Sequence, residues 1–122
     1  MAQTIAGQTY VFDANPAELN RLTLEFDGSA EAVAHVASRG DPVVSQPIGL
    51  DGVFRFSTGS DGRPQGLRGY WADEQTFFLE YDGITNNDHT FFQFRFVGDR
   101  VEVQAQETAH EVGAAFEGRL KN

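Results

Sequence analysis

Hydrophobic and polar residues alternate with a period of two along most of this chain, which is typical of β-strands with one buried face. The clearest example is the stretch 75–96, in which the runs 75–81 and 90–96 each carry aromatic or aliphatic residues on one face. The residues that join them, 82–88, are mainly glycine, asparagine and aspartate, which favour turns. This stretch predicts a long β-hairpin, and we expect the rest of the chain to be arranged around it.

Similar alternating runs precede and follow the hairpin. We expect further strands at residues 8–13, 21–27, 30–38, 53–57, 67–72, 100–106 and 112–120. The pairs Asp27-Gly28 and Gly98-Asp99 are typical of tight turns between such strands. The pattern therefore predicts consecutive antiparallel pairing.

The run 30–38 is the least certain in type, because its alanines favour a helix by intrinsic propensity. The runs on both sides of it have strand periodicity, however. Val33, His35 and Ala37 also keep the period of two, so we expect a strand here.

Two segments predict irregular structure. Pro42 and Pro47 confine the residues between them to an edge or irregular strand, because proline has no N–H to donate to a ladder. Residues 16–19 predict a single helical turn, with Asn15 placed to cap it. No helix longer than one turn is expected.

Turn signals recur about every 8 to 12 residues, a spacing typical of all-β sandwiches and barrels. An open sheet of so many strands leaves two unpaired edges, and closing it removes both. We therefore expect one all-β domain over residues 1–122, an antiparallel meander β-barrel of about 8 to 10 strands that is lipocalin-like in shape.

Aromatic residues dominate the expected inner face, where Phe96 also lies. A barrel of about eight strands is either filled by its side chains or just wide enough for one small ligand, and filling is the commoner case. If a ligand binds, the candidate lining residues are Tyr10, Phe12, Phe26, Phe54, Phe56, Trp71, Phe77, Tyr81, Phe92, Phe94 and Phe116. Alternation places Arg68 and Glu80 on the outside, so this pattern provides no charged group for a ligand's polar end.

Composition narrows the choice of partners. The 122 residues carry a formal net charge of −9, which repels phosphate backbones and anionic lipid headgroups, so we expect neither nucleic acid nor a membrane as partner. With no cysteine, the chain has no disulfide or thiolate site, and this leaves its compartment open. The sequence contains no signal-peptide pattern and no apolar run long enough to span a membrane.

Catalytic and metal-binding patterns are missing. The only lysine, Lys121, has no serine three residues before it, so the Ser-x-x-Lys nucleophile cannot occur. The histidines His35, His89 and His110 lack metal-ligand spacing, and the oxygen-rich segment 82–88 lacks the regular spacing of a calcium loop. We expect no metal and no cofactor.

Segments that cover most of the chain resemble a known family. Residues 50–55, 67–81, 84, 86–88, 98–101 and 116–119 are similar to the C-terminal lipocalin-like barrel of bacterial serine hydrolases related to class C β-lactamases and penicillin-binding proteins. The residues that carry this resemblance are Gly69, Trp71, Thr76, Phe77, Leu79 and Tyr81. In that family the catalytic residues belong to the preceding domain, so none is carried over. The resemblance implies a non-catalytic accessory domain whose partner is a serine hydrolase domain in the same polypeptide or assembly.

Two functions follow from these observations. An accessory domain predicts an exposed apolar patch on an outer wall, around Phe78, Phe91 and Val97. The alternative, a stand-alone lipocalin-like binder of a small apolar ligand, predicts space inside the barrel. An independent enzyme ranks third, because no residue spacing favours it, and we expect no hydrolysis of β-lactams or simple esters.

Overall fold

The structure is a computed structural model, which describes residues 5–15, 19–38, 43–58, 64–83, 88–107 and 112–121. These residues form ten β-strands. The strands are β1 Thr9–Phe12, β2 Leu19–Phe26, β3 Glu31–Ser38, β4 Val44–Gly49, β5 Arg55–Thr58, β6 Pro64–Trp71, β7 Thr76–Gly83, β8 Asp88–Val97, β9 Arg100–Glu107 and β10 Val112–Leu120.

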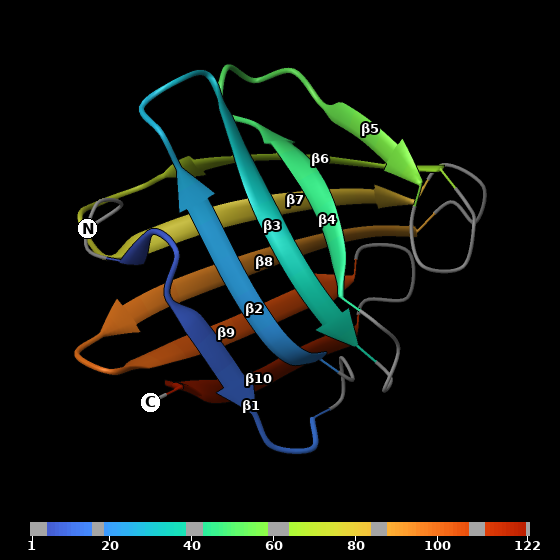
Figure 1. Cartoon of the computed structure of the whole chain (residues 1–122). Coiled ribbons are helices and arrows are strands. Elements are labelled where there is room, and N and C mark those ends of the chain that lie inside the picture. Colours follow the sequence, from blue (N-terminus) through green and yellow to red (C-terminus); the bar gives the residue numbers. More distant parts are fainter. Residues whose placement is uncertain are drawn as a thin grey trace.

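The strands form one sheet that closes on itself. Their order is β4-β3-β2-β1-β10-β9-β8-β7-β6-β5, with antiparallel neighbours throughout, and a parallel bridge between Gly49 and Arg68 joins β4 to β6. In Figure 1, β1 to β4 cross in front of β6 to β10, so the barrel is two layers with crossed strands. The prediction of a closed antiparallel meander barrel is confirmed.

The described turns have local causes. Gly28 (φ +84°) and Gly98 (φ +61°) adopt the left-handed conformation that glycine reaches without steric cost, and each lies in a predicted turn. Between β6 and β7, an Asp73 side-chain oxygen accepts hydrogen bonds from the backbone N–H groups of Gln75 and Thr76, both at 2.8 Å. These turns hold consecutive strands in antiparallel register.

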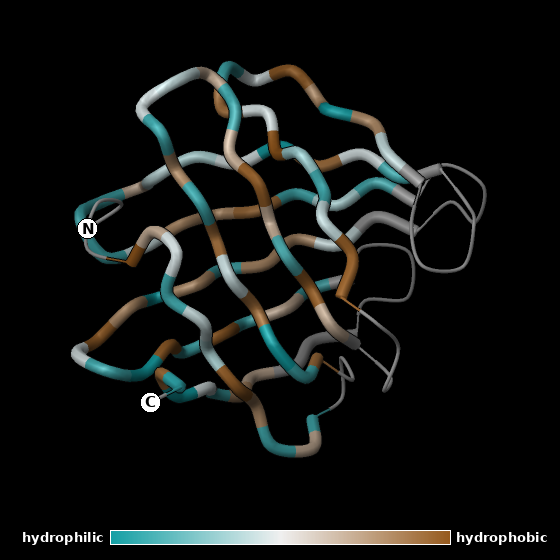
Figure 2. Tube along the Cα trace, in the orientation of Figure 1, coloured by the Kyte–Doolittle hydropathy of each residue, from teal (hydrophilic) through white to brown (hydrophobic). Residues whose placement is uncertain are grey.

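The core lies between the two layers. Hydrophobic and hydrophilic residues alternate along many of the strands (Figure 2). The buried hydrophobic side chains, which come from most of the strands, form one cluster inside the barrel. The largest fully buried side chains are Phe77, Phe96, Leu24, Ile48, Val101 and Val103. Burying a side chain of this size contributes roughly 1.5 to 3 kcal/mol, so these positions dominate the stability of the barrel.

The alanine-rich run is a strand, as predicted. Ala32 and Ala34 point into the core, each 1% exposed, whereas His35 lies on the outside of β3. Pro47 lies in β4, which pairs along its length only with β3, in agreement with the predicted edge character. The predicted turn at 16–19 lies largely outside the described residues, although Asn15 Oδ1 does accept a hydrogen bond from the N–H of Leu19.

The inward placement of Phe54 and Phe56 was wrong. Phe56 pairs with Gly66 on the outer face and is 58% exposed, and the guanidinium of Arg68 lies 4.3 Å from the centre of the Phe54 ring. The inward face of β5 carries Arg55 and Ser57 instead, opposite Leu67 and Gln65. The side chain of Gly66 is a hydrogen, so the outer surface of β6 has room for the Phe56 ring.

Candidate functional site

The barrel interior is the candidate site, and it has two ends. We call them the Trp71 end, near the β2–β3 and β6–β7 turns, and the Phe92 end, where β3, β7 and β9 end. Nine of the eleven candidate lining residues point into this interior, and the two that do not are Phe54 and Phe56.

Aromatic rings and Ile5 fill the Trp71 end. The Trp71 ring packs against Phe26, Phe77 and Phe96, with centroid separations of 5.5, 5.2 and 5.9 Å. Ile5, which lies just before β1, is 3% exposed and belongs to the same core. Phe77 and Phe96 are buried here, whereas Phe26 and Trp71 are partly buried at the surface of this end.

The Phe92 end is less completely covered. Phe12, Tyr81, Phe92 and Phe116 point inward but are only partly buried. The Phe12 and Phe116 rings meet edge to face at 5.7 Å, and Phe92 stacks on the buried Phe94 at 5.9 Å. These rings therefore form an apolar wall. One side of the wall packs against the buried core, and the other side is accessible to solvent.

Uncharged polar groups also face the interior, and two of them, Gln46 and Ser57, were not indicated by the sequence pattern. Gln46 on β4 is 9% exposed, opposite the buried Ala34. The Ser57 hydroxyl on β5 and the Trp71 indole Nε1–H are buried without a hydrogen-bond partner in the structure. Burial raises the pKa of Tyr10, with a smaller contribution from the negative charge of Asp99, so this phenol stays neutral.

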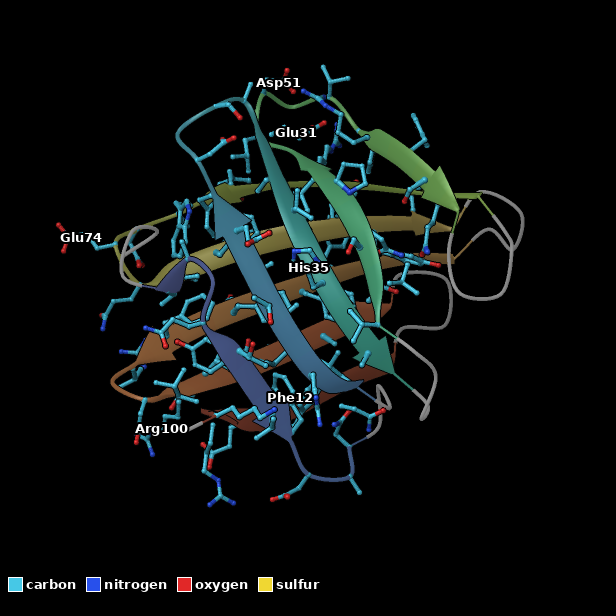
Figure 3. All side chains as sticks on the ribbon, in the orientation of Figure 1. Phe12, Glu31, His35, Asp51, Glu74 and Arg100 are labelled. Atoms are coloured by element: carbon cyan, nitrogen blue, oxygen red, sulfur yellow. The ribbon has the colours of Figure 1, made fainter. Side chains whose placement is uncertain are left out.

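A second cluster, on the outer face of the front layer, has the composition of a catalytic triad. His35 Nδ1 is 2.6 Å from Ser45 Oγ, and His35 Nε2 is 2.6 Å from Glu25 Oε2. Figure 3 shows His35 in the middle of this face. Neither Ser45 nor His35 lines either of the two surface grooves described below, whereas a substrate site is normally concave. The cluster is better explained as cross-strand bonding among β2, β3 and β4.

The described residues line two surface grooves. One, of about 410 Å³, lies beside Phe26 and the carboxylates of Glu25, Asp27 and Glu31. The other, of about 420 Å³, lies on the outside of β7 to β10; the outward-facing side chains among its lining residues are Phe78, Phe91, Gln93, Gln104, Gln106 and Ala115.

Metal and membrane features were checked over the same part of the chain. It contains no group of three or more histidine, aspartate or glutamate side chains arranged to hold a metal ion. Nor do the described ranges include a helix long and apolar enough to cross a membrane. Residues 84–87 and His110 lie outside the description, and the His89 side chain is not described.

Solved structures with the same fold cover almost the whole chain. A fatty acid binding protein of Schistosoma mansoni, in complex with arachidonic acid, has a TM-score of 0.76 at 12% identity, covering 99% of this chain and 98% of its own. A fatty acid-binding protein from the brain of Drosophila melanogaster has a TM-score of 0.69 at 13% identity, and the match covers 94% of this chain and 98% of that protein. Secretory abundant heat soluble protein 4 of Ramazzottius varieornatus has a TM-score of 0.72 at 11% identity, and the match covers 97% of this chain and 94% of that protein.

The resemblance to a hydrolase C-terminal domain was wrong, and so was the accessory function inferred from it. No protein-family model and no curated protein matches the sequence. The similar solved structures include several fatty-acid-binding proteins, each of which the chain covers almost completely. At 8 to 13% identity this likeness shows the fold alone, a closed antiparallel barrel with the same architecture as these structures.

Proposed function

We propose that this chain is a stand-alone binding protein that holds one small apolar molecule inside the barrel, at the Phe92 end. The observation that carries the proposal is the partial burial of the inward rings of Phe12, Tyr81, Phe92 and Phe116. Apolar rings that point inward yet contact solvent gain free energy when a ligand displaces that water, by roughly 25 cal/mol per Å² covered.

Small side chains inside the barrel support the same proposal. Ala34 on β3 faces the interior, and Ala105 on β9 lies directly beside Phe92 in the β8–β9 ladder. Small side chains facing aromatic ones leave more interior volume than two facing aromatic layers. The ligand-bound Schistosoma protein has the same fold, which supports binding inside the barrel by analogy.

Filling this space tests the proposal. Ala105→Trp places a large ring beside Phe92, whereas Gln106→Trp places the same ring on the exposed outer face of the same strand. Nile red, an uncharged dye whose fluorescence rises in apolar surroundings, is titrated into both variants and the parent chain. We expect Ala105→Trp to weaken dye binding at least about tenfold, or about 1.4 kcal/mol, and Gln106→Trp to leave it unchanged.

Circular dichroism spectra and melting temperatures check that both variants fold. If Ala105→Trp does not fold, Ala105→Leu serves in its place, with Gln106→Leu as its control. Equal loss of dye binding in the inner and outer variants, or no loss in either, would contradict a site at the Phe92 end.

A further inference from the structure

We infer that the ligand is uncharged, an alcohol, carbonyl compound or hydrocarbon, and not a carboxylate. This inference rests on the proposed function and specifies the class of molecule bound at that site. The expected ligand of this chain therefore differs from that of two structurally similar proteins, which are described as a fatty acid binding protein and a fatty acid transporter.

The first argument is the position of the cations. On the outer face, Arg68 pairs with Glu80 at 2.7 Å and Arg95 with Glu102 at 3.3 Å. The remaining described cations on exposed positions are Arg21, Arg100, Arg119 and Lys121. None of these six points into the barrel to neutralise a buried carboxylate.

Arg55 is the one described cation whose strand position faces inward, and two carboxylates already hold it. Its Nη2 is 3.0 Å from Asp51 Oδ2 and its Nε is 2.9 Å from Glu31 Oε1. These hydrogen bonds, chiefly the one to Asp51, raise the pKa of Arg55, and Glu31 and Asp51 lie together at the upper rim in Figure 3. Glu31 begins β3 directly after the β2–β3 turn, so this group of one positive and two negative charges lies at the Trp71 end and offers no free cation to a carboxylate at the Phe92 end.

The second argument is the kind of polar group that the interior presents. Gln46 and Ser57 reach it from β4 and β5, and both are neutral. A hydroxyl without a partner, such as that of Ser57, leaves a hydrogen bond unmade, and a ligand hydroxyl or carbonyl oxygen would complete it. An ionised carboxylate needs several such bonds or a cation to offset its lost hydration.

The overall charge acts in the same direction. At a net charge of −9, the field of the chain lowers the local concentration of anions and raises no barrier to neutral molecules. A long-chain alcohol and the acid with the same tail bury the same apolar area, so the difference in their affinities isolates the head group.

Competition against bound Nile red measures that difference, with 1-dodecanol and dodecanoate as competitors. At about pH 8, where a carboxyl group is ionised, we expect the alcohol to displace the dye at least about tenfold more effectively, about 1.4 kcal/mol. The difference should narrow as the pH approaches the pKa of the acid. If neither compound nor dodecane competes, the proposed function fails; if dodecanoate competes as well as dodecanol, only the uncharged-ligand inference fails.

A pair of serine variants tests the polar contact. Ser57→Ala should weaken dodecanol binding about two- to tenfold, the value of one hydrogen bond, and leave dodecane binding unchanged. Ser45→Ala, on the outer face of the neighbouring strand, is the matched control and should change neither. Unchanged dodecanol binding in Ser57→Ala would overturn the role of this hydroxyl.

Discussion

Replacing Trp71 tests how the Trp71 end is stabilised. The indole packs against Phe26, Phe77 and Phe96 and is partly buried. Truncating a large aromatic side chain to alanine typically costs about 3 to 5 kcal/mol, and each ring pair adds about 0.5 to 1.5 kcal/mol beyond its buried area. Because part of the ring contacts solvent, we expect Trp71→Ala to lose about 3 kcal/mol, which is a large share of the roughly 5 to 15 kcal/mol that stabilises a typical domain.

Trp71→Phe is the informative comparison. Phenylalanine keeps a ring against the same three neighbours but removes the buried Nε1–H, which has no partner in the structure. A buried polar group without a partner costs about 1 to 3 kcal/mol, so removing it offsets the apolar area lost with the smaller ring. We therefore expect Trp71→Phe to lie within about 1 kcal/mol of the parent chain.

Urea unfolding followed by far-ultraviolet circular dichroism measures both variants, because the signal does not depend on the chain's only tryptophan. Comparable m-values are required before the free energies of unfolding are compared. A loss in Trp71→Ala within about 0.5 kcal/mol would refute the packing argument. A loss in Trp71→Phe equal to that in Trp71→Ala would show that the indole N–H has a partner.

Three further predictions follow from other parts of the fold. Gly69→Ala should lose about 1 to 3 kcal/mol of stability in the same urea assay, because its new Cβ would lie 2.5 Å from the Phe78 carbonyl oxygen; an unchanged midpoint would contradict this. Hydrogen bonds hold the pKa values of Asp51 and Asp73 below 3.8, so their stabilisation is present above that pH and lost as the pH falls through the lower folded-state values. Melting temperatures should therefore fall as the pH is lowered from 3.8 through the folded-state pKa values of these two carboxyl groups, and they should fall less steeply in Asp73→Asn. Finally, p-nitrophenyl acetate and nitrocefin should be hydrolysed no faster by the parent chain than by Ser45→Ala, since Ser45 lines neither of the two grooves described above; turnover that this substitution removes would establish an active site there.

Much of the fold could be predicted because alternation and turn chemistry are local properties. β10 begins and ends at the predicted residues 112 and 120, and Gly28 and Gly98 form the predicted turns. The closed barrel could be predicted because an open sheet of so many consecutive strands would leave two edges unpaired. These signals require no knowledge of which strands meet across the barrel.

The faces of the shorter or more uniform strands could not be predicted in the same way. β5 has only four residues, and a shift of one residue in register reverses which side chains point inward. Its phenylalanines suggested an inner face, but pairing with β6 places Phe56 outside and Ser57 inside. Ser57 at the end of this strand resembles an ordinary turn residue, and only the closed barrel shows that its hydroxyl is buried.

The incorrect family resemblance has a structural explanation in the β6–β7 hairpin. Gly69 has no room for a Cβ beside Phe77, Asp73 bonds the turn, and Trp71 packs across the barrel against Phe26. Each residue meets a requirement of the barrel itself, so barrels with different functions can share this pattern. Other residues that would distinguish a binder, namely Phe12, Phe92, Gln46 and Ser57, lie outside the segments that carry the resemblance. Substitutions in this hairpin should therefore have a larger effect on stability than on ligand preference. Substitutions at Ser57 should have a larger effect on ligand preference than on stability.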